Sequence, residues 1–245
     1  SSFDSARQCI LRWFFASNSG TSMPTQSAAD GTLIHSLAER FPCGPRSAVM
    51  DALEEEIRAM GVDEGQAASK IHMDHLREMA SALGEYLEQS AQMGNCSDPN
   101  GNIQVEVPFD VPISSVHIRG RIDRMEVEGQ GVRIIDFKTG KKGNKTGAKK
   151  DPDHPQLALY QLAVEQLGYE VLGAELKYLG YGDVRTISQD PLDPETRADW
   201  ISQLDEIGQK MKGPSFIATP SDEACQYCEF ARSCPAREQG KRSVE

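Results

Sequence analysis

The stretch from Val132 to Gly140 has the sequence VRIIDFKTG. It decides the fold class, because its apolar run has the pattern of a buried strand and the polar residues at its end have the pattern of a site. Its β-branched residues predict a strand over 131–138. Side chains alternate between the two faces of a strand, so Asp136 and Lys138 point to the same face. An aspartate and a lysine are unsuited to a core, and we therefore expect them at a sheet edge that faces a site.

A second predicted strand, at about 116–128, precedes this one, and the residues EGQG at 128–131 predict the hairpin turn between them. The hairpin brings Asp123 near Asp136, and two carboxylates repel each other unless a cation lies between them. Such oxygen ligands suit Mg²⁺ or Mn²⁺. The ion would polarise a phosphodiester and activate a bound water, while Lys138 would position that water or stabilise the developing charge. For an isolated Asp-x-Lys pattern, the commoner interpretation is a surface ion pair on a hairpin.

Outward from this hairpin, the periodicity predicts helices on the N-terminal side and a mixture of helices and strands after it. Helices are expected at 3–16, 31–41, 46–60, 66–92 and 155–168, with a long helix after Asp193-Pro194. Further strands are expected from Ile103, at about 172–181 and at 183–188. This order predicts an α/β core with a mostly helical N-terminal layer.

The composition indicates a globular protein: 38% of the 245 residues are hydrophobic and 26% are charged. No apolar run approaches the ~20 residues of a membrane span, no signal peptide is evident, and we expect a cytoplasmic protein with no membrane partner. The net charge of −11 argues against nucleic-acid binding over the whole surface. However, the segment KTGKKGNKTGAKK at 138–150 holds six lysines and no acid, so it is either a solvated loop or a DNA contact.

The six cysteines include a compact C-terminal group, Cys225-x2-Cys228-x5-Cys234-Pro235. Zinc is the metal ion that a C-x2-C pair most commonly binds. A closed zinc or iron–sulfur site needs a fourth ligand in addition to these three cysteines. Cys9, inside the predicted helix at 3–16, is the candidate for that ligand. Cys43 and Cys96 lie in loop-like segments and are expected to be free thiols.

Four weak motifs in a fixed order resemble the PD-(D/E)XK nuclease superfamily in its RecB-like branch. They are Gly31-x3-His35, Gly120-x2-Asp123, Asp136-x-Lys138-Thr139-Gly140 and Gln156-x3-Tyr160. Taken singly, His35 is more often a core or surface histidine, and Gln156 and Tyr160 are more often an exposed helix face. Glu106, on the polar face of the strand from Ile103, has a less certain counterpart and is left outside the core set.

The resemblance implies a central mixed sheet flanked by helices and assigns roles to the matched positions. His35, Asp123, Asp136 and the backbone carbonyl of Phe137 would bind the Mg²⁺ or Mn²⁺ ion, and Lys138 would be the catalytic lysine. The remaining positions, expected to bind DNA or support the site, are Gln156, Tyr160, Lys141 and Lys142.

The cysteines are similar to those of the AddB- and AdnB-type helicase–nucleases, which have one cysteine before the nuclease motifs and three after them. The resemblance implies that Cys9, Cys225, Cys228 and Cys234 hold a [4Fe–4S] cluster that joins the two termini; a zinc site is the alternative. We therefore expect one nuclease domain over 1–245, divided into a helical part at 1–95, a core at 96–190, and a long helix with the cysteine cluster at 191–245.

The sequence thus predicts a metal-dependent deoxyribonuclease, with an exonuclease expected and single-stranded DNA as its partner. No GxxxxGK[ST] phosphate loop occurs, and the first residue is serine. We therefore expect the nuclease module of a longer helicase–nuclease that processes double-strand breaks, with a helicase domain in the parent chain and a possible partner subunit. The alternatives are a catalytically inactive iron–sulfur DNA-binding module, a free-standing exonuclease of the CRISPR-adaptation type, and a zinc-containing interaction domain.

Overall fold

The computed structural model describes residues 2–19, 25–94, 103–140, 148–180, 182–226 and 228–241. The chain forms two compact units. The first, here called the sheet unit, comprises Pro24–Val111 and Ile118–Asp193. The second, here called the terminal unit, comprises Ser1–Met23, Pro112–His117 and Pro194–Glu245.

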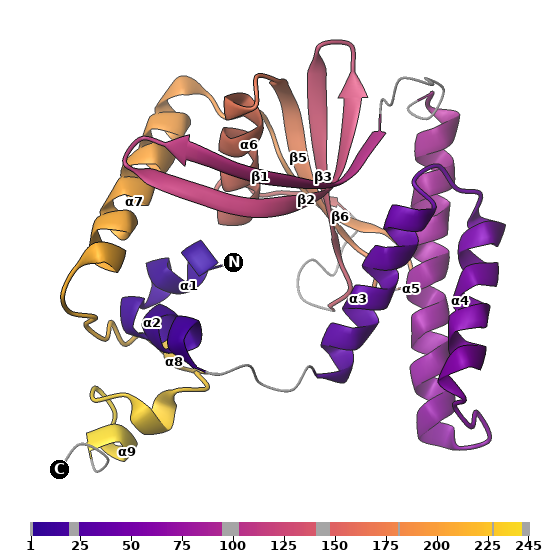
Figure 1. The fold of residues 1–245 in the computed structure, drawn as a ribbon, viewed down its shortest axis with the longest axis horizontal. Coiled ribbons are helices and arrows are strands. Elements are labelled where there is room, and N and C mark those ends of the chain that lie inside the picture. Colours follow the sequence, from indigo (N-terminus) through magenta and orange to yellow (C-terminus); the bar gives the residue numbers. More distant parts are fainter. Residues whose placement is uncertain are drawn as a thin grey trace. The chain divides into compact units, whose positions relative to one another are not determined.

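A six-stranded mixed sheet has the order β1-β2-β3-β5-β6-β4 (Figure 1). Strands β2 and β3 pair antiparallel, β3 and β5 pair parallel, β5 and β6 pair antiparallel, and β4 pairs parallel with β6. The strands are β1 (Ile103–Ile113), β2 (Val116–Glu128), β3 (Gly131–Lys138), β4 (Ala148–Lys150), β5 (Glu170–Tyr178) and β6 (Arg185–Gln189). This confirms the predicted α/β class and the sheet flanked by helices.

The register of β2 against β3 determines where the acidic residues lie. Arg124 pairs with Ile135, so the next positions along the two strands are Asp123 and Asp136. The parallel pair of β3 and β5 requires a crossover, and α6 (Pro155–Gln166) lies within it. Pro155 occupies the first turn of α6, where its missing N–H costs no hydrogen bond.

A helical layer covers the face of β3 that carries Ile135 and Phe137. It consists of α3 (Gln26–Arg40), α4 (Arg46–Met60) and α5 (Ala67–Gln92). The long helix α5 buries a stripe that includes Leu76, Leu83 and Leu87, whose spacing places them on one helical face. Because side chains of β3 alternate, Asp136 lies on the opposite face from Phe137 and is accessible to α6, which supplies two of its hydrogen bonds.

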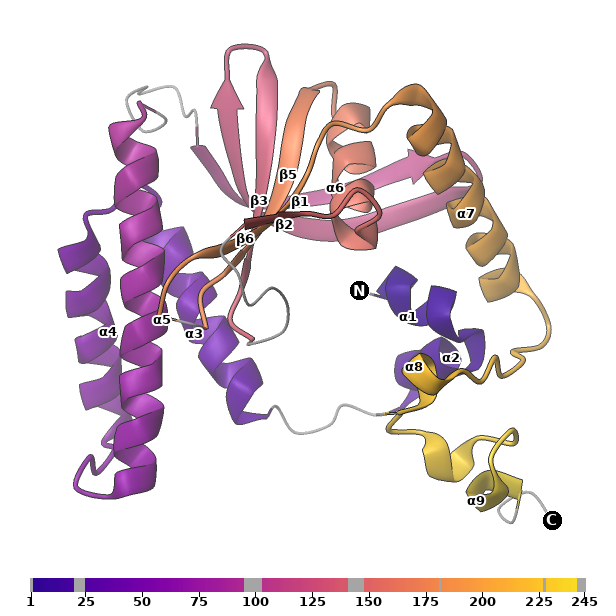
Figure 2. The same ribbon diagram turned by 180° about the vertical axis from the view of Figure 1, so that it is seen from behind.

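The terminal unit contains short helices from both ends of the chain and the long helix α7 (Pro194–Lys212). Its other elements are α1 (Ser2–Gln8), α2 (Ile10–Asn18), α8 (Asp222–Cys225), the 3₁₀-helix η1 (Ala231–Ser233) and α9 (Glu238–Lys241). Figure 2 shows α1, α2, α8 and α9 from the reverse side. Phe3 packs against Trp200 of α7, with ring centroids 6.3 Å apart. The turn between β1 and β2 joins this unit through Asp205, which accepts hydrogen bonds from Ser114 and Ser115.

Three features differ most from the sequence-based expectations, whereas the bounds of β5 and β6 differ by one to three residues. The helix expected at 3–16 is two helices, because Cys9 has an extended backbone (φ −161°, ψ 111°) between them. Helix α3 begins at Gln26 rather than 31, because Thr25 caps it by accepting a hydrogen bond from the N–H of Ala28. The short strand β4 was not expected. No helix among the described residues is long and apolar enough to cross a membrane.

Candidate active site

Three side chains of the sheet unit converge on one point. A ligand atom from each of His35, Glu106 and Asp123 lies within 4.8 Å of the other two. His35 Nδ1 is 3.4 Å from Asp123 Oδ2, and the same carboxylate oxygen accepts a 2.7 Å hydrogen bond from the N–H of Phe137. One imidazole and two carboxylates at this spacing are a ligand set suited to a divalent cation such as Mg²⁺ or Mn²⁺.

Two glycines allow this convergence. A Cβ on Gly31 would lie 3.3 Å from Thr139 Oγ1, so glycine lets α3 approach the end of β3 and place His35 one turn further along the helix. A Cβ on Gly120 would lie 2.5 Å from the ring of Phe109, so glycine gives that ring room against β2, three residues before Asp123. The predicted Gly-x3-His and Gly-x2-Asp spacings thus have a steric basis.

Glu106 reaches the group from β1 with an unusual backbone. Its φ is +51°, a left-handed conformation that a side chain bearing a Cβ rarely adopts, and it persists only where the surroundings enforce it. Glu106 Oε2 accepts a 3.1 Å hydrogen bond from Arg121 Nη1. The sequence showed Glu106 on the polar face of its strand, but the positive φ has no signal in the sequence.

Asp136 is held beside this group by three side chains. Its Oδ1 accepts hydrogen bonds from Gln156 Nε2 (2.8 Å) and from Tyr160 Oη (3.0 Å). Its Oδ2 forms an ion pair with Lys138, although that oxygen receives no hydrogen bond of regular geometry. Gln156 also donates to Tyr160 at 2.9 Å, so the two residues one turn apart on α6 form a single bracket around the carboxylate.

The electrostatics of the site follow from burial and from its carboxylates. Asp136 is 2% exposed, and this burial raises its pKa more than Lys138 lowers it; the charge of Asp123 raises it further. The hydrogen bond to Asp123 raises the pKa of His35 against the opposing effect of burial. Burial, with the charge of Asp136, raises the pKa of Tyr160, so its hydroxyl keeps its proton. A site with this concentration of negative charge favours a cation.

The three ligand atoms lie in an open pocket of about 540 Å³ on the sheet unit. Its walls come from α3, β1, β2 and the residue after β3, and they include Ser27, Thr32, Glu39, Arg121 and Thr139. The pocket gives a substrate access to the converging ligands from solvent.

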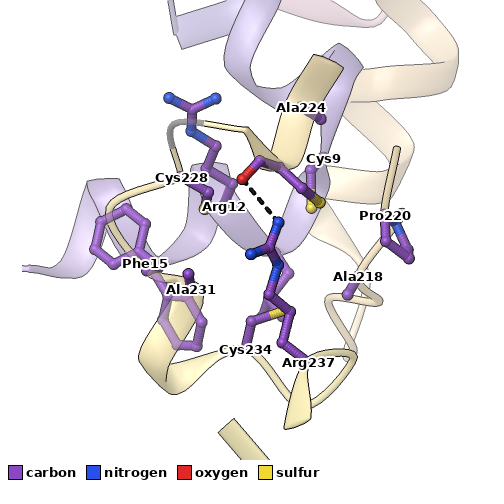
Figure 3. A pocket seen from close by; sticks show the side chains of 13 residues that line it. Cys9, Arg12, Phe15, Ala218, Pro220, Ala224, Cys228, Ala231, Cys234 and Arg237 are labelled. Carbon is purple, nitrogen blue, oxygen red and sulfur yellow. Dashed lines mark hydrogen bonds between the residues drawn. The ribbon is translucent and has the colours of Figure 1, made fainter. Parts of the chain in front are cut away.

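A second pocket, in the terminal unit, is lined by four free cysteines: Cys9, Cys225, Cys228 and Cys234. Figure 3 shows the labelled cysteines from the two ends of the chain around one space, with Arg237 donating a 2.8 Å hydrogen bond to the carbonyl of Cys225. Burial raises the pKa of Cys9, but hydrogen bonds from Thr219 and from backbone N–H groups outweigh it, and the net pKa is lowered. Among the described residues, no three of these sulfur atoms lie within 4.8 Å of one another.

The family follows from a match over most of the sequence. The model of the PD-(D/E)XK nuclease superfamily matches residues 1–235. This chain belongs to the PD-(D/E)XK nuclease superfamily. Membership indicates a metal-dependent nuclease, and members of this superfamily use divalent ions such as Mg²⁺ or Mn²⁺.

Two phage proteins are similar to this nuclease over part of their length. The Gene 69 protein of Mycobacterium phage L5 is 28% identical over 145 residues, which are 57% of this chain and 46% of that protein. The Gene 69 protein of Mycobacterium phage D29 is 25% identical over 142 residues, which are 56% of this chain and 49% of that protein. The matched region spans about half the length of these curated relatives.

Among solved structures, the similarities are weak. The crystal structure of SSO0001 covers 87% of this chain and 99% of its own at 16% identity, with a TM-score of 0.37. Protein VC1899 from Vibrio cholerae covers 76% of this chain and 52% of its own at 15% identity, with a TM-score of 0.28.

Most residues singled out in the sequence lie together in the sheet unit of this nuclease. His35 and Asp123 are in the converging group, whereas Asp136 lies beside it, within the bracket of Gln156 and Tyr160. Lys141, Lys142 and Cys96 lie outside the described residues. Cys43 is disulfide-bonded, so the expectation of a free thiol there was wrong: its loop position gave no information about its partner.

Proposed function

We propose that this nuclease cleaves single-stranded DNA with a divalent ion held by His35, Glu106 and Asp123. The observation that carries the proposal is the convergence of their ligand atoms within 4.8 Å in an open pocket. Asp136 belongs to the proposed ligand set because it follows the β2–β3 register at the position opposite Asp123. The backbone carbonyl of Phe137 is included because the family resemblance implies it.

When bound there, the ion would polarise a phosphodiester and lower the pKa of a coordinated water. The protein supplies the rest of the chemistry. Lys138, on the same face as Asp136, stabilises the charge that develops on the phosphate or orients the attacking water. Gln156 and Tyr160 act through Asp136, because both donate to its Oδ1 and so hold the carboxylate in one orientation.

The test is cleavage of single-stranded DNA with added Mg²⁺ or Mn²⁺. Asp123→Asn and Lys138→Ala are each expected to lower the rate by at least about 100-fold, the effect of removing one group that stabilises a transition state. Lys210→Ala is the matched control, since Lys210 forms only an exposed ion pair with Glu206 on α7. Unchanged cleavage in both active-site variants would contradict the proposed roles. Metal-independent DNA binding without cleavage would instead favour the inactive binding module.

We further propose that the cysteine pocket holds a [4Fe–4S] cluster. Four free thiols line one pocket with largely apolar walls, including Leu11, Phe15 and Phe230, and thiolates are the ligands that iron–sulfur clusters take. A zinc ion with Zn–S distances of about 2.3 Å needs sulfur atoms roughly 3.8 Å apart in tetrahedral geometry. Zinc is the alternative occupant, and the metal content of the purified protein distinguishes it from an iron–sulfur cluster.

The biological setting proposed is a module within a longer helicase–nuclease that processes DNA breaks. It is supported by the resemblance of the arrangement of Cys9, Cys225, Cys228 and Cys234 to that of such enzymes. Purification of the natural full-length protein, followed by an ATP-dependent DNA-unwinding assay, tests it. A free-standing exonuclease is the alternative outcome.

A further inference from the structure

Arg121 is a cationic residue in a pocket of the sheet unit that is also lined by acidic groups. It is the one arginine or lysine among the described residues that line this pocket, whereas three carboxylates line it: Glu39, Glu106 and Asp123. A phosphodiester is itself an anion, so its approach to these carboxylates is opposed unless cations compensate the charge. The metal ion proposed above supplies part of that compensation, and Arg121 is placed to supply more.

Arg121 is placed on the correct face by its strand. It lies two residues before Asp123 in β2, so the two side chains share a face of the sheet. Its backbone carbonyl lies 3.2 Å from Tyr160 Oη, whose single hydroxyl proton is within hydrogen-bond distance of both this carbonyl and Asp136 Oδ1. The strand position of Arg121 is therefore tied to the same bracket that orients the Asp136 carboxylate.

The guanidinium group of Arg121 has donors to spare. Its side chain is 64% exposed, and one N–H group is used on Glu106 Oε2 at 3.1 Å. Arginine carries five N–H donors in a planar fork that matches two oxygen atoms of a phosphate. The bond to Glu106 thus holds the group beside a proposed metal ligand, and this exposed side chain has further donors for a phosphate.

We propose that Arg121 binds a phosphate of the DNA backbone next to the metal ion, and so is a substrate-binding residue of this nuclease. The inference rests on the proposed nuclease function and deepens it. The competing role is a purely positioning one, in which Arg121 acts only by orienting Glu106 as a metal ligand. The two roles differ in what they change: phosphate contact changes DNA affinity and its salt dependence, whereas positioning changes the metal requirement.

The chain offers a matched control in Arg119. It lies on the same face of β2, two residues before Arg121, and forms an ion pair with another β1 carboxylate, that of Asp110, at 3.0 Å. Arg119 is 78% exposed and does not line the pocket. Arg119→Gln therefore removes the same charge from the same strand without touching the proposed contact.

The experiment measures binding of a labelled single-stranded oligonucleotide in a Lys138→Ala background, by fluorescence anisotropy with Mg²⁺ at several salt concentrations. Arg121→Gln is expected to raise Kd roughly 10-fold, the effect of losing one hydrogen-bonded charge contact. The slope of log affinity against log salt should decrease by about 0.7, the contribution of one phosphate in single-stranded DNA. Arg121→Lys should retain the slope with intermediate affinity, because lysine keeps the charge but loses the fork.

In the background that keeps Lys138, the Mg²⁺ concentration for half-maximal cleavage should be the same with and without Arg121→Gln. The proposal is overturned if Arg121→Gln matches Arg119→Gln in affinity and salt slope, or if only the Mg²⁺ requirement shifts. If the unsubstituted protein neither cleaves nor binds the oligonucleotide, the proposed function fails together with the inference. Cleavage by the unsubstituted protein with no effect of Arg121→Gln on binding would remove the inference alone.

Discussion

At the scale of single residues, β2 carries a proposed metal ligand next to a buried ion pair. Asp123 is one of the converging ligands, whereas Arg124 and Glu126 are buried and pair with each other. Arg124 is completely buried and donates to Glu126 Oε1 at 2.7 Å, and the same oxygen accepts hydrogen bonds from Ser90 and Tyr86. This network joins β2 to α5. We therefore expect that breaking it would shift β2 and with it Asp123.

Glu126→Gln is therefore expected to destabilise the protein by about 3–5 kcal/mol, the usual cost of leaving a buried ion uncompensated. Urea unfolding at neutral pH measures it. Glu206→Gln, which removes an exposed partner of Lys210, is the control and should have a much smaller effect. Equal effects of the two substitutions would show that the buried pair has no special role.

The stabilisation from the Arg124–Glu126 pair depends on pH, and its direction follows from the pKa of Glu126. Burial raises the pKa of Glu126, but the charge and hydrogen bonds of Arg124, with those of Ser90 and Tyr86, outweigh it, and the net pKa is lowered. The stabilisation is then fully present above the unfolded value of about 4.3 and is lost as the pH falls through the folded pKa. The stability difference between the unsubstituted protein and Glu126→Gln should accordingly shrink below about pH 4.

At the scale of elements, the site depends on how tightly the ends of β3 and β5 approach each other. Leu179 donates a 2.8 Å backbone hydrogen bond to the carbonyl of Lys138, which continues the β3–β5 pairing past the last strand residue. A Cβ on Gly180 would lie 2.5 Å from the carbonyl oxygen of Thr139. Because position 180 is glycine, the chain after β5 can pack closely against Thr139, the residue that follows Lys138.

Gly180→Ala is expected to displace this strand end, with a cost of about 1–3 kcal/mol in stability from overpacking. Because small misplacements of catalytic groups are costly, cleavage should fall roughly 10- to 100-fold. Gly140→Ala is the matched control, since a Cβ there meets nothing within 4 Å. Thermal unfolding and the cleavage assay measure the two effects. Full activity of a folded Gly180→Ala protein would contradict this account of the strand end.

At the scale of the whole molecule, the terminal unit is assembled from sequence at both ends of the chain. Thr219 donates to the carbonyl of Gln8, next to Cys9, and Phe216 stacks on Phe14 with ring centroids 4.3 Å apart. The four cysteines of the pocket come from these same segments. A cluster bound there would add covalent ligation to a unit whose helices, apart from α7, are short.

Cys228→Ser and Cys234→Ser are each expected to lower iron content and the visible absorbance of protein purified without oxygen. Amide hydrogen exchange should then lose protection in residues 2–19 and 194–241 and keep it in 25–94, because metal binding stabilises the fold that forms its site. Ser233→Ala, a neighbouring exposed position, is the control. A colourless protein containing zinc instead of iron would contradict the proposed cluster.

The sequence by itself determined the α/β class, the β2–β3 hairpin and the spacing of His35, Asp123, Asp136 and Lys138. These features depend on local rules: side-chain alternation in strands, helical periodicity and turn residues, which neighbouring positions encode. The same rules misplaced the start of α3 and the break at Cys9, since a cap and one extended residue leave little trace in periodicity.

Only the tertiary structure decided which side chains share the site. Glu106 reaches the site because its backbone has a positive φ. Asp136 accepts hydrogen bonds from Gln156 and Tyr160, on a helix about 20 residues away in sequence. Arg121, one residue after the Gly120 of a recognised motif, is a pocket residue because its strand presents it beside Glu106. Such contacts depend on the packing of elements distant in sequence, and no local pattern specifies how those elements meet.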